Sequence, residues 1–415
     1  MRLVVIIAAL AALAVAAGAE ARAVRPAALV RSRARAEGRD GLRAPALSRA
    51  LELRGGASVS PASSTGGRAG VLQLAALFGA WYGFNIWYSL VAKMVLQWWK
   101  SPWLFTVLQL GIGSLWVAAQ WVPIPTFGLN GARAKTFTLR PVPQLSRAEV
   151  RALLPIAACL AAGHVASTMA MFYGTVAFAN VVKTAEPLFT CAFSALILKQ
   201  TFSPRTYATL IPIMGGVAYA STNELSFSWM SLGTAMSSNV AFALRAILAK
   251  LSMRSAAAAT LSAANLFAVV NMLALALTLP LALLLEAPGA RASWDAALAK
   301  GVSSAELVQL ILVTGVTYYL YNELAFMCLG KVDPVTHAVA NTIKRVAVIA
   351  VSILYFNNPT TKQGILGSAV AVVGVLLYSL ALDSEKKLKL AAAPAPARPS
   401  CRKGKGWRKL FARAK

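Results

Sequence analysis

Four basic residues lie inside stretches of the sequence that are otherwise apolar: Lys183, Arg245, Lys344 and Arg345. With a helical rise of about 1.5 Å per residue, the two lysines lie roughly 12–15 Å into their segments. That depth is near the centre of a hydrocarbon core about 30 Å thick. Because a charge there costs roughly 2.5–3.5 kcal/mol on insertion scales, residues of this kind usually serve a ligand or an ion pathway.

The same segments contain few acids that could balance these cations. Glu186 follows Lys183 by three residues and is its expected partner in a structural ion pair, and Glu323 could serve a second base. Two of the four cations would remain without a counter-charge, and an unpaired buried charge costs several kcal/mol. We therefore expect an anionic ligand. A phosphate fits, because arginine offers a planar fork for its oxygens and lysine a compact point charge.

Other polar residues in the apolar segments could complete such a site. His164 and Ser167 lie three residues apart on one helix face, and Tyr321 adds a phenol. Structural alternatives stay open, since Lys183 could serve only its ion pair, Arg245 could extend to the membrane surface, and His164 could be a helix-packing donor.

An enzyme is not indicated by these residues. An intramembrane enzyme acting on a lipid phosphate would need paired carboxylates, a metal cluster or a nucleophile beside a base. The sequence has two histidines, isolated membrane acids and four scattered cysteines without zinc spacing. We therefore expect no catalytic residue, no metal and no cofactor.

The residues belong to a chain with the composition of a membrane protein. Its 415 residues are 58% hydrophobic and 13% charged, and apolar stretches of about 20 residues recur from residue 71 to residue 385. We predict an all-α membrane protein with ten transmembrane helices in two inverted five-helix repeats. The expected spans are 73–96, 103–122, 150–173, 175–198, 205–222, 229–250, 261–286, 305–329, 334–357 and 363–383.

Two features indicate the repeat. Lys183 and Lys344 both lie near the middle of a span, and GGVAYAS (215–221) resembles VGVLLYS (373–379) at nearly the same separation. Five spans in each half would insert the second half inverted, and such repeats place a substrate site between the halves. Chance similarity between apolar helices is the alternative.

Both ends of the chain differ from the apolar region. Residues 1–23 have the basic start, apolar run and small residues of a signal peptide, and residues 24–70 are arginine-rich and acid-poor like a transit peptide. The combination predicts import into a complex plastid, with a secretory signal plus a disordered linker, or an uncleaved anchor helix, as alternatives. We expect a membrane domain at 71–385 and a basic tail at 386–415. Because much of the net charge of +27 lies in these ends, it favours targeting or lipid contact over nucleic-acid binding.

Residues 72–382 resemble the plastid phosphate translocators, the triose-phosphate/phosphate branch of the drug/metabolite transporter superfamily. The most specific motifs are K-x-x-E-P at residues 183–187 and K-R at residues 344–345. Longer matching stretches include FGAWYGFNIWYSLVAKMVL and GHVASTMAMFYGTVAFANVVKTAEPLF. The resemblance implies a ten-helix carrier that exchanges inorganic phosphate for a phosphorylated sugar or acid across the inner plastid envelope.

The resemblance also implies a set of substrate-binding residues, each carried over by its place in a matching motif. Those implied to bind the phosphoryl group are Lys183, Lys344, Arg345 and Tyr321. Those implied to make other contacts are His164, Ser167, Phe242 and Arg245, the last at the far end of the substrate.

Some positions depart from the family pattern and bear on the substrate. Glu323 stands where glutamine is usual and would add an anion near the site, and Ala179 and Asn180 alter the lining before Lys183. His164 matches the triose- and hexose-phosphate branches, whereas the phosphoenolpyruvate branch usually has asparagine there.

We therefore expect a monomeric antiporter in the inner envelope membrane of a plastid, exchanging phosphate for a phosphorylated C3 compound, triose phosphate or 3-phosphoglycerate. The alternatives are a phosphoenolpyruvate, pentose-phosphate or hexose-phosphate translocator of the same membrane, or a nucleotide-sugar antiporter of the Golgi or endoplasmic reticulum. Its partners would be small phosphorylated molecules and membrane lipids, not nucleic acid.

Overall fold

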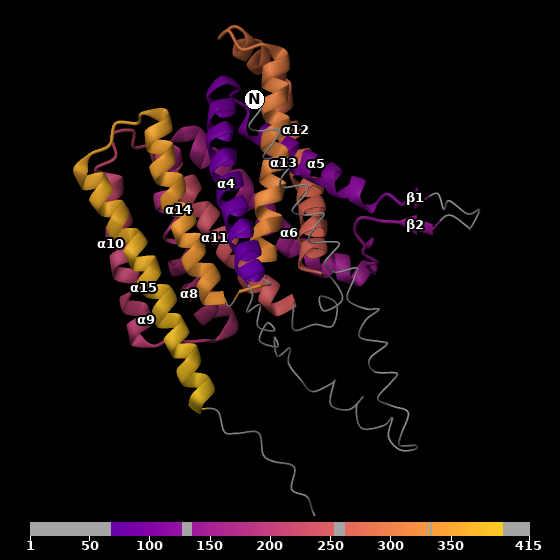
Figure 1. The fold of residues 1–415 in the computed structure, drawn as a ribbon. Helices are drawn as coiled ribbons and strands as arrows, with labels where there is room; N and C mark the ends of the chain where they lie inside the picture. Colours follow the sequence, from indigo (N-terminus) through magenta and orange to yellow (C-terminus); the bar gives the residue numbers. More distant parts are fainter. Residues whose placement is uncertain (1–67, 127–134, 253–261, 330, 333, 393–415) are drawn as a thin grey trace, which may run out of the picture.

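The computed structural model describes residues 68–126, 135–252, 262–329, 331–332 and 334–392. The predicted signal peptide and nearly all of the transit-like segment lie outside these ranges, as does most of the basic tail. Its first seven residues, 386–392, continue the last helix. Figure 1 shows the chain as a bundle of long helices. The helices are α4 (Arg68–Trp98), α5 (Pro102–Trp121), α6 (Arg147–Tyr173), α7 (Val176–Lys183), α8 (Glu186–Leu198), α9 (Pro204–Ala208), α10 (Leu210–Thr222), α11 (Trp229–Ser252), α12 (Ala263–Leu298), α13 (Ser304–Leu329), α14 (Pro334–Phe356) and α15 (Lys362–Ala392).

The described residues form an all-α membrane protein apart from one short ladder. Strands β1 (Ile124–Thr126) and β2 (Lys135–Phe137) pair antiparallel, with Ile124 opposite Phe137, in the connection between α5 and α6. Figure 1 shows β1 and β2 projecting to the side of the helices. The sequence analysis did not predict these strands, because their three-residue length gives no periodic signal.

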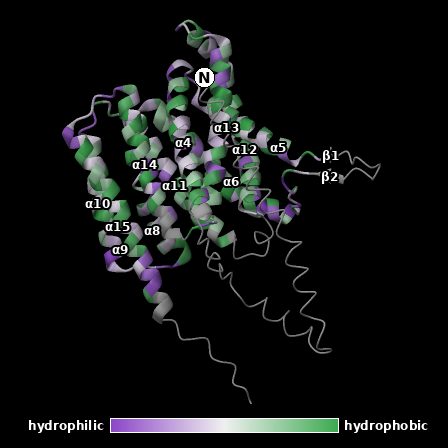
Figure 2. Cartoon of the chain, in the orientation of Figure 1, coloured by the Kyte–Doolittle hydropathy of each residue, from purple (hydrophilic) through white to green (hydrophobic). Residues whose placement is uncertain are grey.

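Nine helical segments of the described chain are long and apolar enough to cross a membrane. They include α7 and α8 taken together as Val176–Leu198. The expected span at 205–222 is not among the nine, since it is divided into α9 and the 13-residue α10. Figure 2 shows hydrophobic residues along much of α15 and hydrophilic residues near the ends of the helices, as expected for spans in a bilayer.

Local sequence explains where the helices near the cavity begin and end. Ser146 and Glu149 form a reciprocal capping box at the start of α6. Gly174 ends α6, and the Thr175 hydroxyl caps the first turn of α7. The next segment divides between Lys183 and Glu186, where a proline follows as the second residue of α8. Proline has no N–H to continue a helical ladder, so this break belongs to the K-x-x-E-P motif itself.

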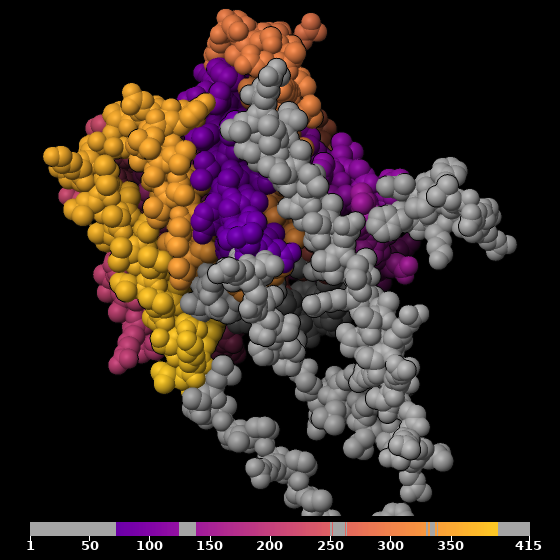
Figure 3. Space-filling model, viewed as in Figure 1, coloured from indigo at the N-terminus to yellow at the C-terminus, as the bar shows by residue number. Residues whose placement is uncertain are grey.

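The helices pack in pairs that join distant parts of the chain. α6 packs against α11, α4 against α13, α5 against α12 and α10 against α15. α14 contacts both α4 and α7, and Figure 3 shows α15, α14 and α4 side by side on one face of the molecule. Many large apolar side chains on the spans are exposed, Leu354 to 80% and Leu284 to 75%, as expected where helices meet lipid.

Glycines allow α10 and α15 to approach closely. A Cβ added to Gly216 would overlap the backbone of Ala371, and a Cβ added to Gly374 would lie 2.9 Å from the Ile213 nitrogen. Small residues at such crossings let helices pack backbone to backbone within a membrane.

This crossing predicts different effects for two adjacent glycines. Gly216→Ala should destabilise the folded protein by about 1–3 kcal/mol, because the added methyl overpacks the crossing. Gly215→Ala is the matched control, since a Cβ there meets nothing within 4 Å and alanine favours the helix. Unfolding temperatures of the two purified variants in detergent check this, and equal temperatures would contradict the tight crossing.

Candidate functional site

A cavity of about 320 Å³ lies between α4, α6, α7, α11, α13 and α14. Every site residue predicted from the sequence lines it: His164, Ser167, Lys183, Glu186, Phe242, Arg245, Tyr321, Lys344 and Arg345. The structure thus brings together side chains that are up to 181 positions apart in the sequence.

Three cations converge where the broken fourth span meets α14. Lys183 is the last residue of α7, and α7 contacts α14, which carries Lys344 and Arg345 in its middle. The three side chains lie within electrostatic reach of one another. The Lys344 ammonium also lies 4.9 Å from the ring centre of Trp81 and 6.0 Å from that of Tyr321, so two aromatic faces attract it.

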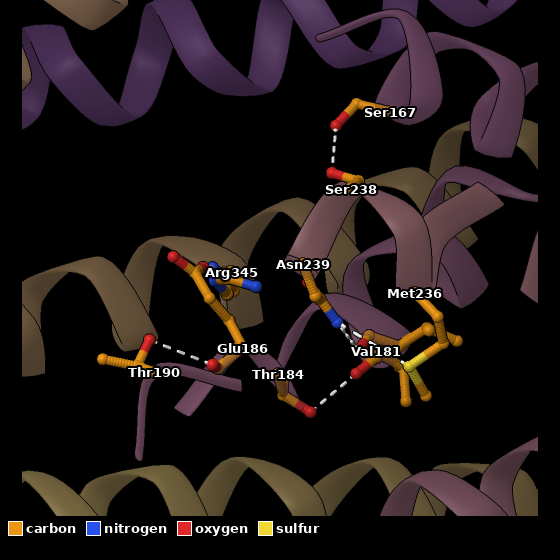
Figure 4. Close-up of polar contacts among 10 residues, drawn as sticks. Ser167, Val181, Thr184, Glu186, Thr190, Met236, Ser238, Asn239 and Arg345 are labelled. Atoms are coloured by element: carbon orange, nitrogen blue, oxygen red, sulfur yellow. Dashed lines mark hydrogen bonds and ion pairs between the residues drawn. The ribbon is translucent and has the colours of Figure 1, made fainter. Parts of the chain in front are cut away.

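The predicted partner of Glu186 was wrong. Its Oε2 pairs with Arg345 Nη2 at 2.7 Å instead of pairing with Lys183. The prediction assumed a continuous helix, in which residues three apart share a face. Because α7 ends at Lys183 and α8 begins at Glu186, that geometry is lost and the carboxylate meets α14. Figure 4 shows Glu186 and Arg345 side by side.

The expected place of Glu323 was also wrong. Its carboxylate is buried and forms an ion pair with Arg140, in the segment that follows β2, and it does not line the cavity. A second Arg140 nitrogen lies 3.4 Å from the Tyr319 hydroxyl. The sequence gave no sign of this pair, since Arg140 lies in a connection with no helical period.

The cavity therefore has fewer anions than the sequence analysis assumed. Within the described residues, Lys183, Arg245 and Lys344 form no ion pair, and Glu186 alone supplies a carboxylate to the cavity. Three of the four cations, one more than expected, thus lack a carboxylate partner.

The fourth cation forms a separate polar group with aromatic neighbours. The Arg245 guanidinium lies 5.1 Å from the ring centre of Phe242 and acts electrostatically on the Tyr318 and Tyr321 phenols. The Phe242 ring packs so closely on Gly163 that no larger residue would fit there. This packing fixes the ring on which the guanidinium rests.

His164 lies between these two groups. Its ring stacks on Tyr318 with centroids 4.1 Å apart, and it acts electrostatically on Lys183. On the same helix face, the Ser167 hydroxyl lies 2.7 Å from that of Ser238 (Figure 4). Helices α6 and α11 are thereby joined at the cavity.

Several cavity residues were not singled out by the sequence analysis. Trp81 stacks on His337, whose Nε2 lies 3.2 Å from the Ala325 carbonyl oxygen. Asn239 lies six residues before Arg245 on α11, and as a neutral amide it carries no charge that would mark it in an apolar span. The cavity is also lined by Asn85, Asn322 and Asn341, and by Asn180, which the sequence analysis expected to alter the lining.

Four atoms of cavity residues are buried without a hydrogen-bond partner. They are Trp81 Nε1, His164 Nε2, Arg345 Nη1 and Asn239 Oδ1. Buried polar groups are normally paired, so each is a candidate contact for a bound polar molecule. No group of three or more His, Cys, Asp or Glu suited to a metal occurs among the residues that the structure describes.

The fold and the cavity define a class of protein, a polytopic helical membrane transporter with a basic site between its helices. Comparison with known proteins gives the family. The model of the Triose-phosphate Transporter family matches residues 72–379, and the chain belongs to that family. It is a transporter rather than an enzyme.

The curated relatives agree with this assignment. The chain is 35% identical to phosphoenolpyruvate/phosphate translocator 3 of Oryza sativa subsp. japonica, over 76% of each chain. It is 33% identical to the xylulose 5-phosphate/phosphate translocator of Arabidopsis thaliana, over 78% of this chain and 73% of the relative. It is also 33% identical to the triose phosphate/phosphate translocator of Pisum sativum, over 76% and 74%. All three relatives are named as chloroplastic proteins.

The buried Arg140–Glu323 pair predicts a stability effect. Arg140→Met or Glu323→Met alone should each destabilise the fold by about 3–5 kcal/mol, because the remaining charge is left buried without its partner. The double variant should lose less than the sum of the two, since both charges are then absent.

Unfolding temperatures in detergent give the comparison. Arg291→Met removes one partner of an exposed ion pair with Asp295 and serves as the control that should change little. Additive losses at Arg140 and Glu323 would show that the two residues do not stabilise one another.

Proposed function

We propose that this transporter exchanges inorganic phosphate for a phosphorylated metabolite by alternating access. The observation that carries the proposal is the convergence of Lys183, Lys344 and Arg345 in a cavity to which Glu186 brings the only carboxylate among the described residues. A dianionic phosphoryl group supplies the charge that balances them. The names of the three relatives support this, since each name pairs a phosphorylated compound with phosphate as the molecules translocated.

Residues at one end of the cavity would bind the phosphoryl group of the substrate, and residues at the other end would bind the rest of the molecule. Lys183, Lys344 and Arg345 bind the phosphoryl oxygens, with the Arg345 Nη1 that lacks a partner donating one bond. Tyr321, beside Lys344, donates a hydrogen bond to the phosphoryl group through its phenolic O–H. Glu186 keeps the other side of the guanidinium paired and thereby fixes its orientation.

The remaining predicted residues would contact the rest of the molecule. Arg245, resting on Phe242, reaches a second anionic or polar group. His164 and Ser167 present a ring nitrogen and a hydroxyl between the two ends. These roles depend on the resemblance and on the residues' shared cavity.

A phosphorylated C3 compound, triose phosphate or 3-phosphoglycerate, is the substrate we favour. A short substrate suits two cationic groups within one cavity of about 320 Å³, and His164 fits the triose-phosphate pattern. Phosphoenolpyruvate, pentose phosphate and hexose phosphate are the alternatives within the family, and nucleotide sugars the alternative outside it. Competition against phosphate uptake by a panel of these compounds separates them.

Charge repulsion gives a reason for strict exchange. Without an anion, Lys183, Lys344 and Arg345 repel one another when the cavity closes around them in a low dielectric. A bound phosphoryl group removes that repulsion, so the loaded protein passes through the occluded state more readily than the empty one. Only a ligand with different affinities for the two states can drive such a change.

We further propose that the fold is a ten-helix carrier of two inverted five-helix repeats. The α10–α15 crossing supports this, because Gly216 meets Ala371 while Gly374 meets Ile213, and both members of each pair are shifted by the same 158 residues. The packing of α6 on α11 corresponds in the same way to that of α13 on α4. Residues 204–222, as α9 and α10, then form the fifth span in chain order and bring the total to ten.

We place the protein in the inner envelope membrane of a plastid, as a monomer whose membrane domain is formed by residues 71–385. The signal- and transit-like segments 1–23 and 24–70 support import into a complex plastid. The chloroplastic names of the relatives support the plastid. The alternative location is a membrane of the secretory pathway. Imaging the full chain fused to a fluorescent protein distinguishes the two locations.

Purified protein in liposomes tests the proposed exchange. Labelled phosphate should enter vesicles that contain phosphate and should enter empty vesicles at a small fraction of that rate. Equal uptake into both would indicate a uniporter or a channel and would overturn the proposal.

Removing one cation of the cluster should reduce this exchange. We expect Lys344→Ala or Arg345→Ala to lower phosphate exchange at least tenfold, because a charge-assisted contact contributes about 1.5–3 kcal/mol. Lys362→Ala removes an exposed lysine at the start of α15, outside the cavity, and should exchange at the wild-type rate. Wild-type rates in either cavity variant would disprove the assigned contacts.

A further inference from the structure

Asn239 differs from the other groups of the cavity in what it offers a ligand. Of the four buried atoms without partners, Trp81 Nε1 and Arg345 Nη1 can only donate a hydrogen bond, and His164 Nε2 can do either according to its tautomer. Asn239 Oδ1 can only accept. Phosphate and carboxylate oxygens need donors, so an acceptor serves some other part of the ligand.

The orientation of this amide is fixed by the break in the fourth span. Asn239 Nδ2 donates to the carbonyl oxygen of Val182, the residue before Lys183, at 2.9 Å. The same carbonyl oxygen also accepts a bond from the Ala185 N–H at 3.1 Å, in the turn between α7 and α8, so Asn239 occupies its second acceptor position. The amide nitrogen is thus engaged, and the oxygen is left for another donor.

Asn239 lies in the wall of the cavity, where α11 meets the end of α7. Its side chain is 1% exposed, lines the cavity and joins α11 to the end of α7. Phe242 and Arg245 follow at three and six residues, so the three residues cover about 120° of the helix surface and roughly 9 Å of its length, and all three line the cavity. Asn239 lies at the Lys183 end of this row, and Arg245 lies at the other.

We propose that Asn239 Oδ1 accepts a hydrogen bond from a hydroxyl group of the substrate and makes the carrier favour hydroxylated phosphate esters over those without a hydroxyl. The proposal rests on the proposed function and adds to it the class of substrate. A buried acceptor left unpaired costs free energy, so an ester that lacks the hydroxyl binds less well. 3-Phosphoglycerate carries such a hydroxyl, whereas phosphoenolpyruvate has a phosphoryl group and a carboxylate but no hydroxyl.

The test measures how strongly these two compounds inhibit phosphate–phosphate exchange in liposomes. The wild-type protein should favour 3-phosphoglycerate over phosphoenolpyruvate, and Asn239→Leu should reduce that preference about three- to tenfold, as for one lost neutral hydrogen bond. Asn239→Asp keeps acceptor oxygens but loses the donor to Val182. This variant should weaken the inhibition by both compounds to the same extent and preserve the preference.

Asn271→Leu is the matched control. Asn271 is also a fully buried asparagine whose Nδ2 binds a helix carbonyl, that of Leu110, and whose Oδ1 has no partner, but it lies outside the cavity. Its variant should show a comparable loss of stability and an unchanged preference.

The outcomes separate this proposal from the function on which it rests. An unchanged preference in Asn239→Leu would overturn it, as would loss of the preference in Asn239→Asp to the same extent as in Asn239→Leu. A wild-type protein that favours phosphoenolpyruvate would also overturn it while phosphate exchange persists. Absence of phosphate exchange in the wild-type protein would instead refute the proposed function.

Discussion

Cations that repel one another are held in a cavity to which the described residues contribute one carboxylate. Lys183, Lys344 and Arg345 approach one another at the end of α7 and the middle of α14, and Glu186 forms its ion pair with Arg345. Coulomb energies between such charges grow severalfold as the dielectric falls from that of water towards that of a protein interior. The folded chain bears this cost because rigid helices hold the cations in place.

The break in the fourth span determines which of the cations is paired within the protein. The interruption between α7 and α8 places Lys183 at the end of one helix and Glu186 at the start of the next, so the two side chains no longer share a face. The carboxylate is thereby directed to Arg345 instead, which leaves the lysine charges for a ligand. In the turn formed by the same break, the Val182 carbonyl oxygen accepts from both the Ala185 N–H and the Asn239 amide, and so orients that amide. One local feature thus orients both charged and neutral groups of the cavity.

Much of the site could be predicted from the sequence because buried charges are conspicuous in apolar segments. Lys183, Arg245 and Lys344 were identified by depth alone, and all three line the cavity. Ion-pair partners could not be predicted, since they depend on where a helix stops and on contacts between distant elements. Glu186 and Glu323 were both given the wrong surroundings for this reason.

The fold followed from the sequence to a similar extent. Most spans with long apolar runs were predicted near their observed limits, but α12 continues to Leu298, twelve residues beyond the expected end at 286. The short ladder of β1 and β2 and the division of α9 from α10 were not predicted. A three-residue strand and a one-residue helix interruption leave too little periodic signal to recognise. Asn239 was missed for another reason, because a neutral amide in an apolar helix is inconspicuous until its orphaned oxygen is seen.

The most direct test of the central claim measures the thermal stability of the purified protein as phosphate is added at constant ionic strength. If the cavity cations need an anion, phosphate should raise the unfolding temperature saturably, corresponding to about 2.7 kcal/mol at a hundredfold excess over its dissociation constant. Chloride should not do so, and the Lys344→Ala variant should lose most of the effect. No phosphate-specific rise, or an equal rise in the variant, would contradict the account.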